Sequence, residues 1–292
     1  MPSYKTHSIH GESIFSKIDM FVQIQKEDLK IFCIGPDSLI LTDYKTFSYQ
    51  HANNTKDYFE YLLKLIKEKK LNDNKEVIAF LYGQIDHFVL DFTIHPLIFY
   101  MTSDLPKENR INHHGIVEMW IDEFIMQKFG KNELNYYHKW IIKSKELQTI
   151  INELYYKLFD CKRAGIKYSF GITSTILFDI LVRNNLLHLM KPLNKIVNIG
   201  DITYHDDISR SLPFINMENS NWYNPFTKEE MALSFMDLWE IASSRSLEMI
   251  NDVNNYLYYD KNLSNHWILD NTSYNTGLPC ENGQKLQYVK KY

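Results

Sequence analysis

Residues 76–94 of this chain read EVIAFLYGQIDHFVLDFTI, a run that is too apolar on every side for a helix at the protein surface. We interpret it as a helix buried in the core. Pro96 is expected to end it, because the residue before a proline disfavours the α conformation. The run nevertheless contains two ionisable groups, His87 and Asp91, and burying a charge is costly unless it is paired or bound to a metal.

Helical periodicity also dominates the sequence around this run. Residues 57–70 place apolar side chains on one face and lysines on the other, which predicts an amphipathic helix. Residues 113–129 predict a further helix, which Gly130 should end. Downstream, helices are predicted over residues 133–160 and 172–190.

The remaining segments are less regular. Residues 193–226 are predicted to form a long connection, and the capping-box spacing of Thr227 and Glu230 predicts that the next helix begins there. The best strand candidate, SLILT at residues 38–42, is weak. No segment is typical of a linker between two domains. We therefore expect an all-α fold in which residues 1–292 form a single multi-helix domain, with the functional motifs in its N-terminal half.

Composition excludes several classes of protein. Only 10 of the 292 residues are glycine, about half the average share of roughly 7%. This scarcity argues against a β-rich protein with many tight turns and against glycine-rich phosphate loops. The formal net charge of −4 provides no basic surface for nucleic acid, so no nucleic-acid partner is expected.

The cysteines and the apolar runs bear on the location of the protein. Cys33, Cys161 and Cys280 are odd in number and far apart, which is typical of a reducing compartment rather than of a disulfide scaffold. The N-terminal residues show no secretory signal pattern, and no run approaches the roughly 18–20 apolar residues that cross a bilayer. We therefore expect a cytoplasmic protein without a transmembrane segment, and the oligomeric state is left open.

Two histidine–carboxylate pairs stand out. His87 and Asp91, and likewise His114 and Glu118, are four residues apart, so each pair shares one helix face and can share one metal ion. A single pair of this kind is usually an ordinary hydrogen-bonded contact. Here two pairs lie close together in the sequence, and one of them is inside an apolar run and followed by His95. A metal site is therefore an equally good interpretation.

Further candidates lie upstream of these pairs. Asp37, in a Gly-Pro-Asp turn, could aim a carboxylate into a cavity, although alone it is typical of a turn residue. His51 begins a polar loop and alone is typical of a surface residue. His7 and His10 are three residues apart, and each alone is typical of a surface histidine in a first helical turn.

The order of these residues is itself a pattern. It comprises Thr6-His7, Gly35-Pro36-Asp37, His51, HFVLDFTIHP at residues 87–96 and HGIVE at residues 114–118. This ordered set resembles the zinc-dependent phospholipase C family, in its bacterial branch without a leader, and more distantly the P1-type nucleases. The resemblance covers about residues 1–125, and no catalytic motif of the family is recognised in residues 130–292.

The resemblance implies an all-α fold that holds a cluster of up to three zinc ions (Zn2+). The first ion would be bound by Asp37, His51, His87 and Asp91. The second ion would be bound by His95, His114 and Glu118. Asp91 would bridge toward a third ion, held also by His7 and the N-terminal amine. We expect two zinc ions and leave the third open, with His10 either a replacement ligand or an exposed residue.

The resemblance also implies an activity. It is typical of a metal-dependent hydrolase of phosphate esters, a phospholipase C-type phosphodiesterase that attacks with a zinc-bound hydroxide. Asp37 is the candidate for orienting that group or acting as general base. Asp122, one turn beyond Glu118, is either a partner for a ligand histidine or a surface carboxylate. The expected substrate is a phosphate ester, with phospholipid as one candidate.

Two alternatives to this function stay open. One is a protein that binds metal without catalysis, and the other is a helical interaction protein that binds no metal. The aromatic tail, residues 265–292, is interpreted either as a flap over the site or as a strap packed on the helices.

Overall fold

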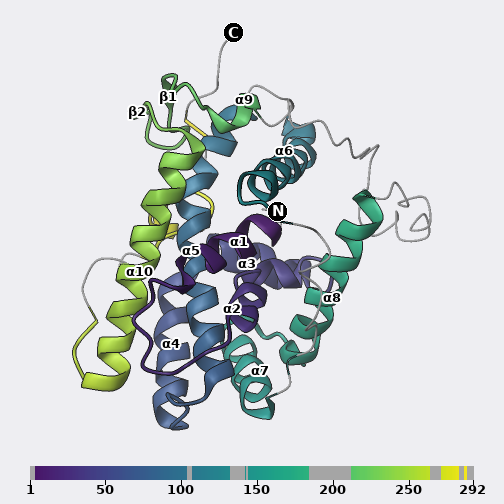
Figure 1. The fold of residues 1–292 in the computed structure, drawn as a ribbon. Coiled ribbons are helices and arrows are strands. Elements are labelled where there is room, and N and C mark those ends of the chain that lie inside the picture. The colour runs from purple at the N-terminus through teal and green to yellow at the C-terminus, as the bar shows by residue number, and fades with distance from the viewer. Residues whose placement is uncertain are drawn as a thin grey trace.

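The computed structural model of the protein describes residues 4–103, 107–131, 142, 144–183, 212–263, 271–282 and 286–287. Within these residues the protein is built of helices, with one short two-stranded hairpin at one end (Figure 1). The predicted all-α fold is therefore confirmed, whereas the assignment of the whole chain to one domain stays a prediction.

The two longest helices in the described residues, α5 and α10, run side by side, and the N-terminal helices pack beside them (Figure 1). The labels η1 and η5 denote 3₁₀ helices. The bounds in chain order are α1 (Tyr4–Phe15), α2 (Lys26–Phe32), η1 (Gly35–Leu39), α3 (Tyr44–Ala52), α4 (Thr55–Glu68), α5 (Lys75–Met101), α6 (Lys107–Lys128), α7 (Lys145–Phe159), α8 (Ala164–Arg183), α9 (Leu212–Ile215), β1 (Trp222–Tyr223), β2 (Glu230–Met231), α10 (Phe235–Tyr259) and η5 (Cys280–Asn282).

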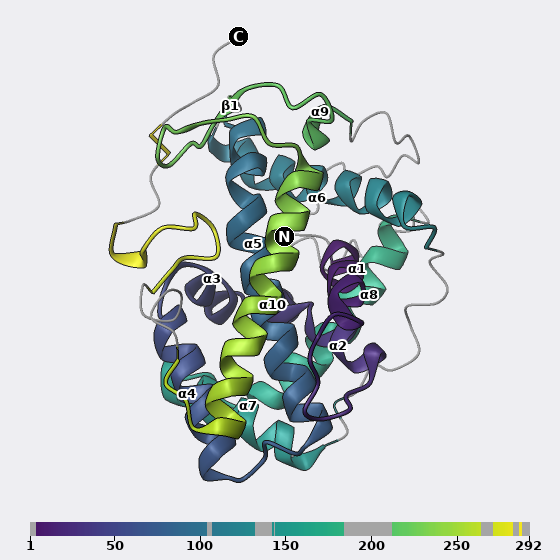
Figure 2. The same ribbon diagram turned by 60° about the vertical axis from the view of Figure 1, so that its left-hand side comes forward.

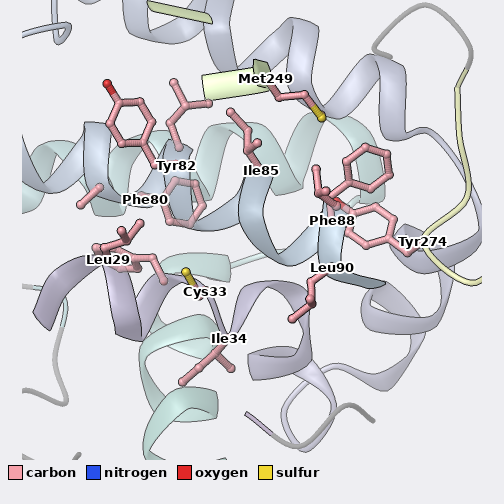
Figure 3. Packing of buried hydrophobic residues seen from close by; sticks show 14 of the residues in the cluster. Leu29, Cys33, Ile34, Phe80, Tyr82, Ile85, Phe88, Leu90, Met249 and Tyr274 are labelled. Carbon is pink, nitrogen blue, oxygen red and sulfur yellow. The ribbon is translucent and has the colours of Figure 1, made fainter. Parts of the chain in front are cut away.

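Helix α5 is the centre of the fold, with α10 packed along it and α2 against another side (Figure 2). Its first turn is capped by the side chain of Asn74, which accepts hydrogen bonds from the backbone N–H groups of Glu76 and Val77. Figure 3 shows the buried side chains that pack around it, which include Leu29, Cys33, Phe80, Ile85, Phe88, Met249 and Tyr274.

Burial along α5 explains its apolar sequence. By length and composition alone, α5 is the one described helix that could cross a membrane, but 94% of the stretch that meets this test is buried inside the protein. Helix α2 approaches it closely at Gly83, where an added Cβ atom would lie only 2.5 Å from the carbonyl carbon of Phe32. The helix is therefore a core helix, as the sequence predicts.

Pro96 does not end α5, contrary to the sequence expectation. The helix continues to Met101, and Ile98 beyond the proline remains buried. Proline lacks the N–H group that would bond to the carbonyl of Phe92. The backbone of Gly277 packs over that carbonyl, since an added Cβ atom at Gly277 would lie 3.1 Å from its oxygen. Tertiary packing around α5 thus outweighs the local cost of the proline.

The helix expected to begin at Thr227 begins later, at Phe235. Residues 222–231 form the antiparallel hairpin of β1 and β2 instead. The capping box lies at Ser234, whose hydroxyl accepts from the backbone N–H of Asp237, while the Asp237 carboxylate accepts from the backbone N–H of Ser234. A capping box does begin this helix, but it is formed by Ser234 and Asp237 rather than by Thr227 and Glu230.

The other predicted helices agree with the structure where it describes them. Helix α4 covers most of residues 57–70, and α6 ends just before Gly130, whose φ of +59° is typical of a glycine after a helix. Helix α7 lies within the predicted range 133–160, and α8 covers the described part of residues 172–190 but begins earlier than predicted, at Ala164. The weak strand candidate at residues 38–42 does not form a strand, because this segment forms the end of η1 and the turns that follow.

Candidate metal centre

Three residues of the predicted ligand set lie on one face of α5. His87, Asp91 and His95 follow one another at one-turn spacing, and each exposes at most 3% of its surface. His51 lies in the last turn of α3 rather than at the start of a loop, and it is buried too. Because water does not reach these side chains, their polar atoms need partners within the protein or a bound ion.

Backbone carbonyls fix three of the histidine rings. In each of them the Nδ1 atom contacts a carbonyl oxygen, which can only accept a hydrogen bond, so Nδ1 carries the proton. When such a ring is neutral, its Nε2 atom presents a lone pair. The contacts, at 2.8, 3.0 and 3.0 Å, are those of His51 with Phe47, His87 with Cys33 and His95 with Tyr274.

The first group of ligand atoms comprises Asp37, His51 and His87. Asp37 lies in η1, which Gly35 opens with a φ of +60°. Its Oδ1 atom is 3.1 Å from Nε2 of His51 and 3.9 Å from Nε2 of His87. Oδ2 of Asp91 lies 3.5 and 3.2 Å from the same two nitrogens. The structure thus brings together the four residues expected around a first ion.

The second group comprises His95 of α5 with His114 and Glu118 of α6. Oε1 of Glu118 is 2.8 Å from Nε2 of His114 and 3.5 Å from Nε2 of His95. The i, i+4 spacing aligns the two residues of α6, and the packing of α6 on α5 adds the third. The three residues expected around a second ion therefore also meet.

His7 of α1 forms a third group with His87 and Asp91. Its buried ring stacks on that of His87, with 4.1 Å between centroids, and its Nε2 atom is 3.2 Å from Oδ1 of Asp91. The same Oδ1 atom lies 3.6 Å from Nε2 of His95, so Asp91 stands between all three groups. A cavity of about 20 Å³ adjoins His7, Asp91, His95 and Glu118. The N-terminal amine, expected as a further ligand here, lies outside the described residues.

The polar atoms of these groups fit a metal ion better than they fit one another. Nε2 of His7, His51, His87 and His95 and both carboxylate oxygens of Asp37 are buried and make no hydrogen bond. Where Nδ1 is protonated and the ring neutral, the Nε2 lone pair faces a carboxylate oxygen, which is repulsive unless a cation lies between them. Imidazole nitrogen and carboxylate oxygen are the ligands of many zinc sites, so the residues present fit zinc.

A model of the zinc dependent phospholipase C family matches residues 6–164, more than half of the chain, and includes every residue of the three groups. This chain belongs to the zinc-dependent phospholipase C family. No significant match is found among curated proteins or among solved structures. The predicted resemblance is confirmed, and with it zinc as the cofactor, whereas the role of each ligand residue stays a proposal.

Negative charge is concentrated at the centre of this phospholipase C-family fold. Burial raises the pKa of Asp91, but the neighbouring histidines, first of all His95 and His87, hold it well below its usual range. Burial would lower the pKa of His51, yet the carboxylates of Asp37 and Asp91, 3.1 and 3.5 Å from its Nε2 atom, raise it to about 9. A proton on His51 therefore provides part of the positive charge that zinc provides when bound.

We expect zinc binding to release protons at neutral pH. With a pKa of about 9, His51 is protonated at pH 7 in the metal-free protein, and only the neutral ring can bind zinc. Zinc affinity should therefore rise with pH until the pH passes the pKa of His51. Titration calorimetry in buffers of different ionisation enthalpy should find about one more proton released by the wild type than by His51→Gln. Equal release by the two proteins would contradict this assignment.

His10 is neither an exposed residue nor part of the three described ligand groups, contrary to both expectations. Its Nδ1 atom lies 2.8 Å from Oδ1 of Asp86, and its Nε2 atom lies 3.0 Å from Oγ of Ser243. The hydroxyl of Ser246 donates to the same oxygen of Asp86, and all four residues are buried. This network joins α1 to α5 and α10 one turn away from His7, so it holds the N-terminal helix against the metal centre.

We expect His10→Leu to lower the free energy of unfolding of the zinc-free protein by about 2–4 kcal/mol, because it removes the imidazole from the buried carboxylate of Asp86, which retains the hydroxyl of Ser246. Urea denaturation with a chelator present measures this change without a contribution from metal binding. Lys17→Ala, an exposed change just beyond α1, is the control and should shift stability by less than about 0.5 kcal/mol. If both variants unfold like the wild type, the buried pair does not stabilise α1.

Two further residues support the metal centre, and one of them, Asp122, is buried rather than a surface carboxylate. Oδ1 of Asp122 accepts hydrogen bonds from the backbone N–H and the hydroxyl of Thr6, at 2.8 and 2.6 Å, and so holds the residue before His7. Tyr274 is fully buried, with its ring 4.7 Å from that of Phe88, which supports the strap interpretation for residues 271–282. Tyr274 also provides the backbone carbonyl that orients His95. Any residue type can provide a backbone carbonyl, so the sequence could not identify Tyr274 for this role.

Proposed function

We propose that this chain hydrolyses phosphate esters, with phospholipids as the substrate class, at a centre of two zinc ions. The observation that carries the proposal is the set of buried Nε2 atoms that face carboxylates without making a hydrogen bond. Family membership supports both the metal and the substrate class. The proposed ligands are Asp37, His51, His87 and Asp91 for one ion, and His95, His114 and Glu118 for the other.

Asp37 is the catalytic group of this proposal. Zinc, when bound, provides a water acidic enough to react at neutral pH and positive charge for the phosphate oxygens. Neither carboxylate oxygen of Asp37 makes a hydrogen bond, so one can hold the ion while the other orients the attacking water or accepts its proton. Asp91 and Glu118 each face two or more histidines at short distance, so we assign them to holding metal rather than to moving protons.

We also propose a third, weaker zinc site at His7. Of the residues that complete this group, Asp91 can serve the first ion with one oxygen and this ion with the other, whereas the single Nε2 lone pair of His87 can bind only one ion. His7 is therefore the one ligand in the described residues that we assign to this site alone. Zinc titration of the wild type should resolve two tight steps and one weaker step. His7→Ala should remove the weaker step and leave the other two.

Hydrolysis by the zinc-loaded protein tests the proposed function. The substrates are a soluble phosphodiester, bis(4-nitrophenyl) phosphate, and phosphatidylcholine. Asp37→Asn keeps the shape of the side chain but removes its charge, and it should lower kcat at least about 10²-fold. Asp57→Asn, an exposed change in the first turn of α4, is the control and should keep the wild-type kcat.

The same assay separates the two alternatives. Equal rates for the wild type and Asp37→Asn would favour a protein that binds metal without catalysis. A chain that also binds no zinc would favour a helical interaction protein. The buried, unbonded Nε2 atoms argue against the second alternative, because a metal-free helical protein would leave them without partners.

A further inference from the structure

Helix α8 exposes a stripe of large apolar side chains. Ile166, Phe170 and Leu177 expose 63%, 64% and 50% of their surface, and their spacing places them on one face of the helix. The opposite face is part of the core, where Tyr168 and Ile172 are fully or almost fully buried. Thr173 and Ser174 lie between Phe170 and Leu177 on this side of the helix. Three apolar groups of this size on one face are rarely left to water unless the face contacts a partner.

Basic side chains border one end of this stripe. Lys162 and Arg163 line a surface depression of about 490 Å³ between α7 and α8, together with Ile166 and the exposed ring of Tyr156. Neither Lys162 nor Arg163 forms an ion pair within the described residues. Both point to a partner that carries negative charge.

Nearby carboxylates do not neutralise this charge. Glu153, which also lines the depression, forms a 2.8 Å ion pair with Lys69. Asp43 is paired with Lys167. Asp160 is the one exposed carboxylate in the turn between α7 and α8. The depression therefore keeps a net positive charge beside an apolar stripe.

The stripe lies close to the proposed catalytic residue. Helix α8 lies along one edge of the molecule (Figure 1) and packs directly on η1, the element that carries Asp37. An added Cβ atom at Gly171 would lie 1.7 Å from the carbonyl oxygen of Ser38, so the two backbones are in contact. The exposed face of α8 is therefore about one helix diameter, roughly 10 Å, from the backbone beside Asp37.

We propose that this face of α8 docks the protein on a bilayer that contains anionic phospholipids. The stripe of Ile166, Phe170 and Leu177 would enter the interfacial region, and Lys162 and Arg163 would contact lipid phosphates, as in other helices that lie on membranes. A second copy of the chain would cover the apolar stripe but would offer no anionic group that is known to meet Lys162 and Arg163, so the bilayer is the occupant we propose and the copy is an outcome of the test. The inference rests on the proposed function for the substrate lipid, and it adds how the centre reaches that lipid.

Vesicle co-sedimentation of the full chain tests the docking face. The vesicles contain either phosphatidylcholine alone or phosphatidylcholine mixed with phosphatidylglycerol. The wild type should bind the mixed vesicles at least about tenfold better, because each basic side chain near an anionic surface adds affinity. The double variants Ile166→Ser/Phe170→Ser and Lys162→Glu/Arg163→Glu should each lower binding to mixed vesicles at least about fivefold.

A matched control comes from the far end of α10. Tyr259 is 57% exposed and Lys261 lies over its ring, 5.5 Å from the centroid, so this pair offers a similar exposed aromatic and cation. Tyr259→Ser/Lys261→Glu should bind vesicles like the wild type. If the control loses binding to the same extent as the α8 variants, binding is a general charge effect and the docking face is overturned.

Two further outcomes would overturn the docking proposal. The first is a wild type that stays in the supernatant with mixed vesicles. The second is a dimer in light scattering that Ile166→Ser/Phe170→Ser converts to a monomer, which would make a second copy the occupant. Both α8 double variants should hydrolyse bis(4-nitrophenyl) phosphate at the wild-type rate. Absence of that hydrolysis in the wild type would overturn the proposed function, whereas the vesicle results decide docking separately.

Discussion

Asp91→Asn should lose at least one zinc ion per chain and lower kcat/KM for bis(4-nitrophenyl) phosphate by about 10²- to 10³-fold. The two carboxylate oxygens of Asp91 face histidines from three helices, with Oδ1 3.2 Å from His7 and Oδ2 3.2 Å from His87. Asparagine keeps the volume but removes the negative charge and directs an N–H group at one of these nitrogens. Asp91 also lies 3.6 Å from Nε2 of His95, so it is within 3.6 Å of a histidine from each of the three ligand groups.

Zinc content by mass spectrometry and hydrolysis kinetics check this result on the same samples. Asp57→Asn, exposed on α4, serves again as the control and should match the wild type in both measurements. A variant at Asp91 with full zinc content and wild-type kinetics would mean that this carboxylate is not a ligand.

Gly35→Ala should weaken both the fold and the first zinc site. Gly35 has a φ of +60°, a conformation that costs a residue with a side chain about 1–2 kcal/mol. An added Cβ atom would also lie 2.4 Å from Cγ of His87, so either η1 or the His87 ring must move. We expect a loss of about 2–4 kcal/mol in unfolding free energy and a weaker first zinc site.

Gly115→Ala provides a matched control for this variant. Gly115 also lies beside a ligand residue, in α6 between His114 and Glu118, but an added Cβ atom there meets nothing within 4 Å. Alanine in a helix interior should stabilise the protein by up to about 1 kcal/mol and leave zinc binding unchanged. If Gly35→Ala behaves like Gly115→Ala in thermal denaturation and zinc titration, the close approach of Gly35 to His87 is not required.

The part of the centre built by one helix could be predicted from local spacing. His87, Asp91 and His95 share a face because they are four residues apart, and the apolar run around them requires burial. His114 and Glu118 are also four residues apart, so their spacing likewise predicts that they share one face of α6. Spacing cannot show that these two helices meet, nor that η1 and α3 bring Asp37 and His51 to the same place. Those residues were found through the order of motifs shared with the family.

The wrong predictions for Pro96 and His10 have one physical cause, which is packing between segments that are distant in the sequence. Pro96 is a helix breaker by local rules, but the helix continues through it to Met101 because the residues on both sides are packed in the core. From the sequence alone His10 is typical of a surface histidine near the start of a helix, but it is buried against Asp86 of α5 and Ser243 of α10. The carbonyls of Cys33 and Tyr274, which orient the rings of His87 and His95, are also supplied by tertiary contacts, so no pattern in the sequence marks them.

Zinc content per chain tests the central claim most directly. The protein should be purified without added zinc, dialysed against a weak chelator and measured by mass spectrometry together with Asp91→Asn. The buried imidazole and carboxylate groups predict at least two zinc ions per wild-type chain, and fewer in the variant. Fewer than one ion per wild-type chain would contradict the metal centre and every proposal that depends on it.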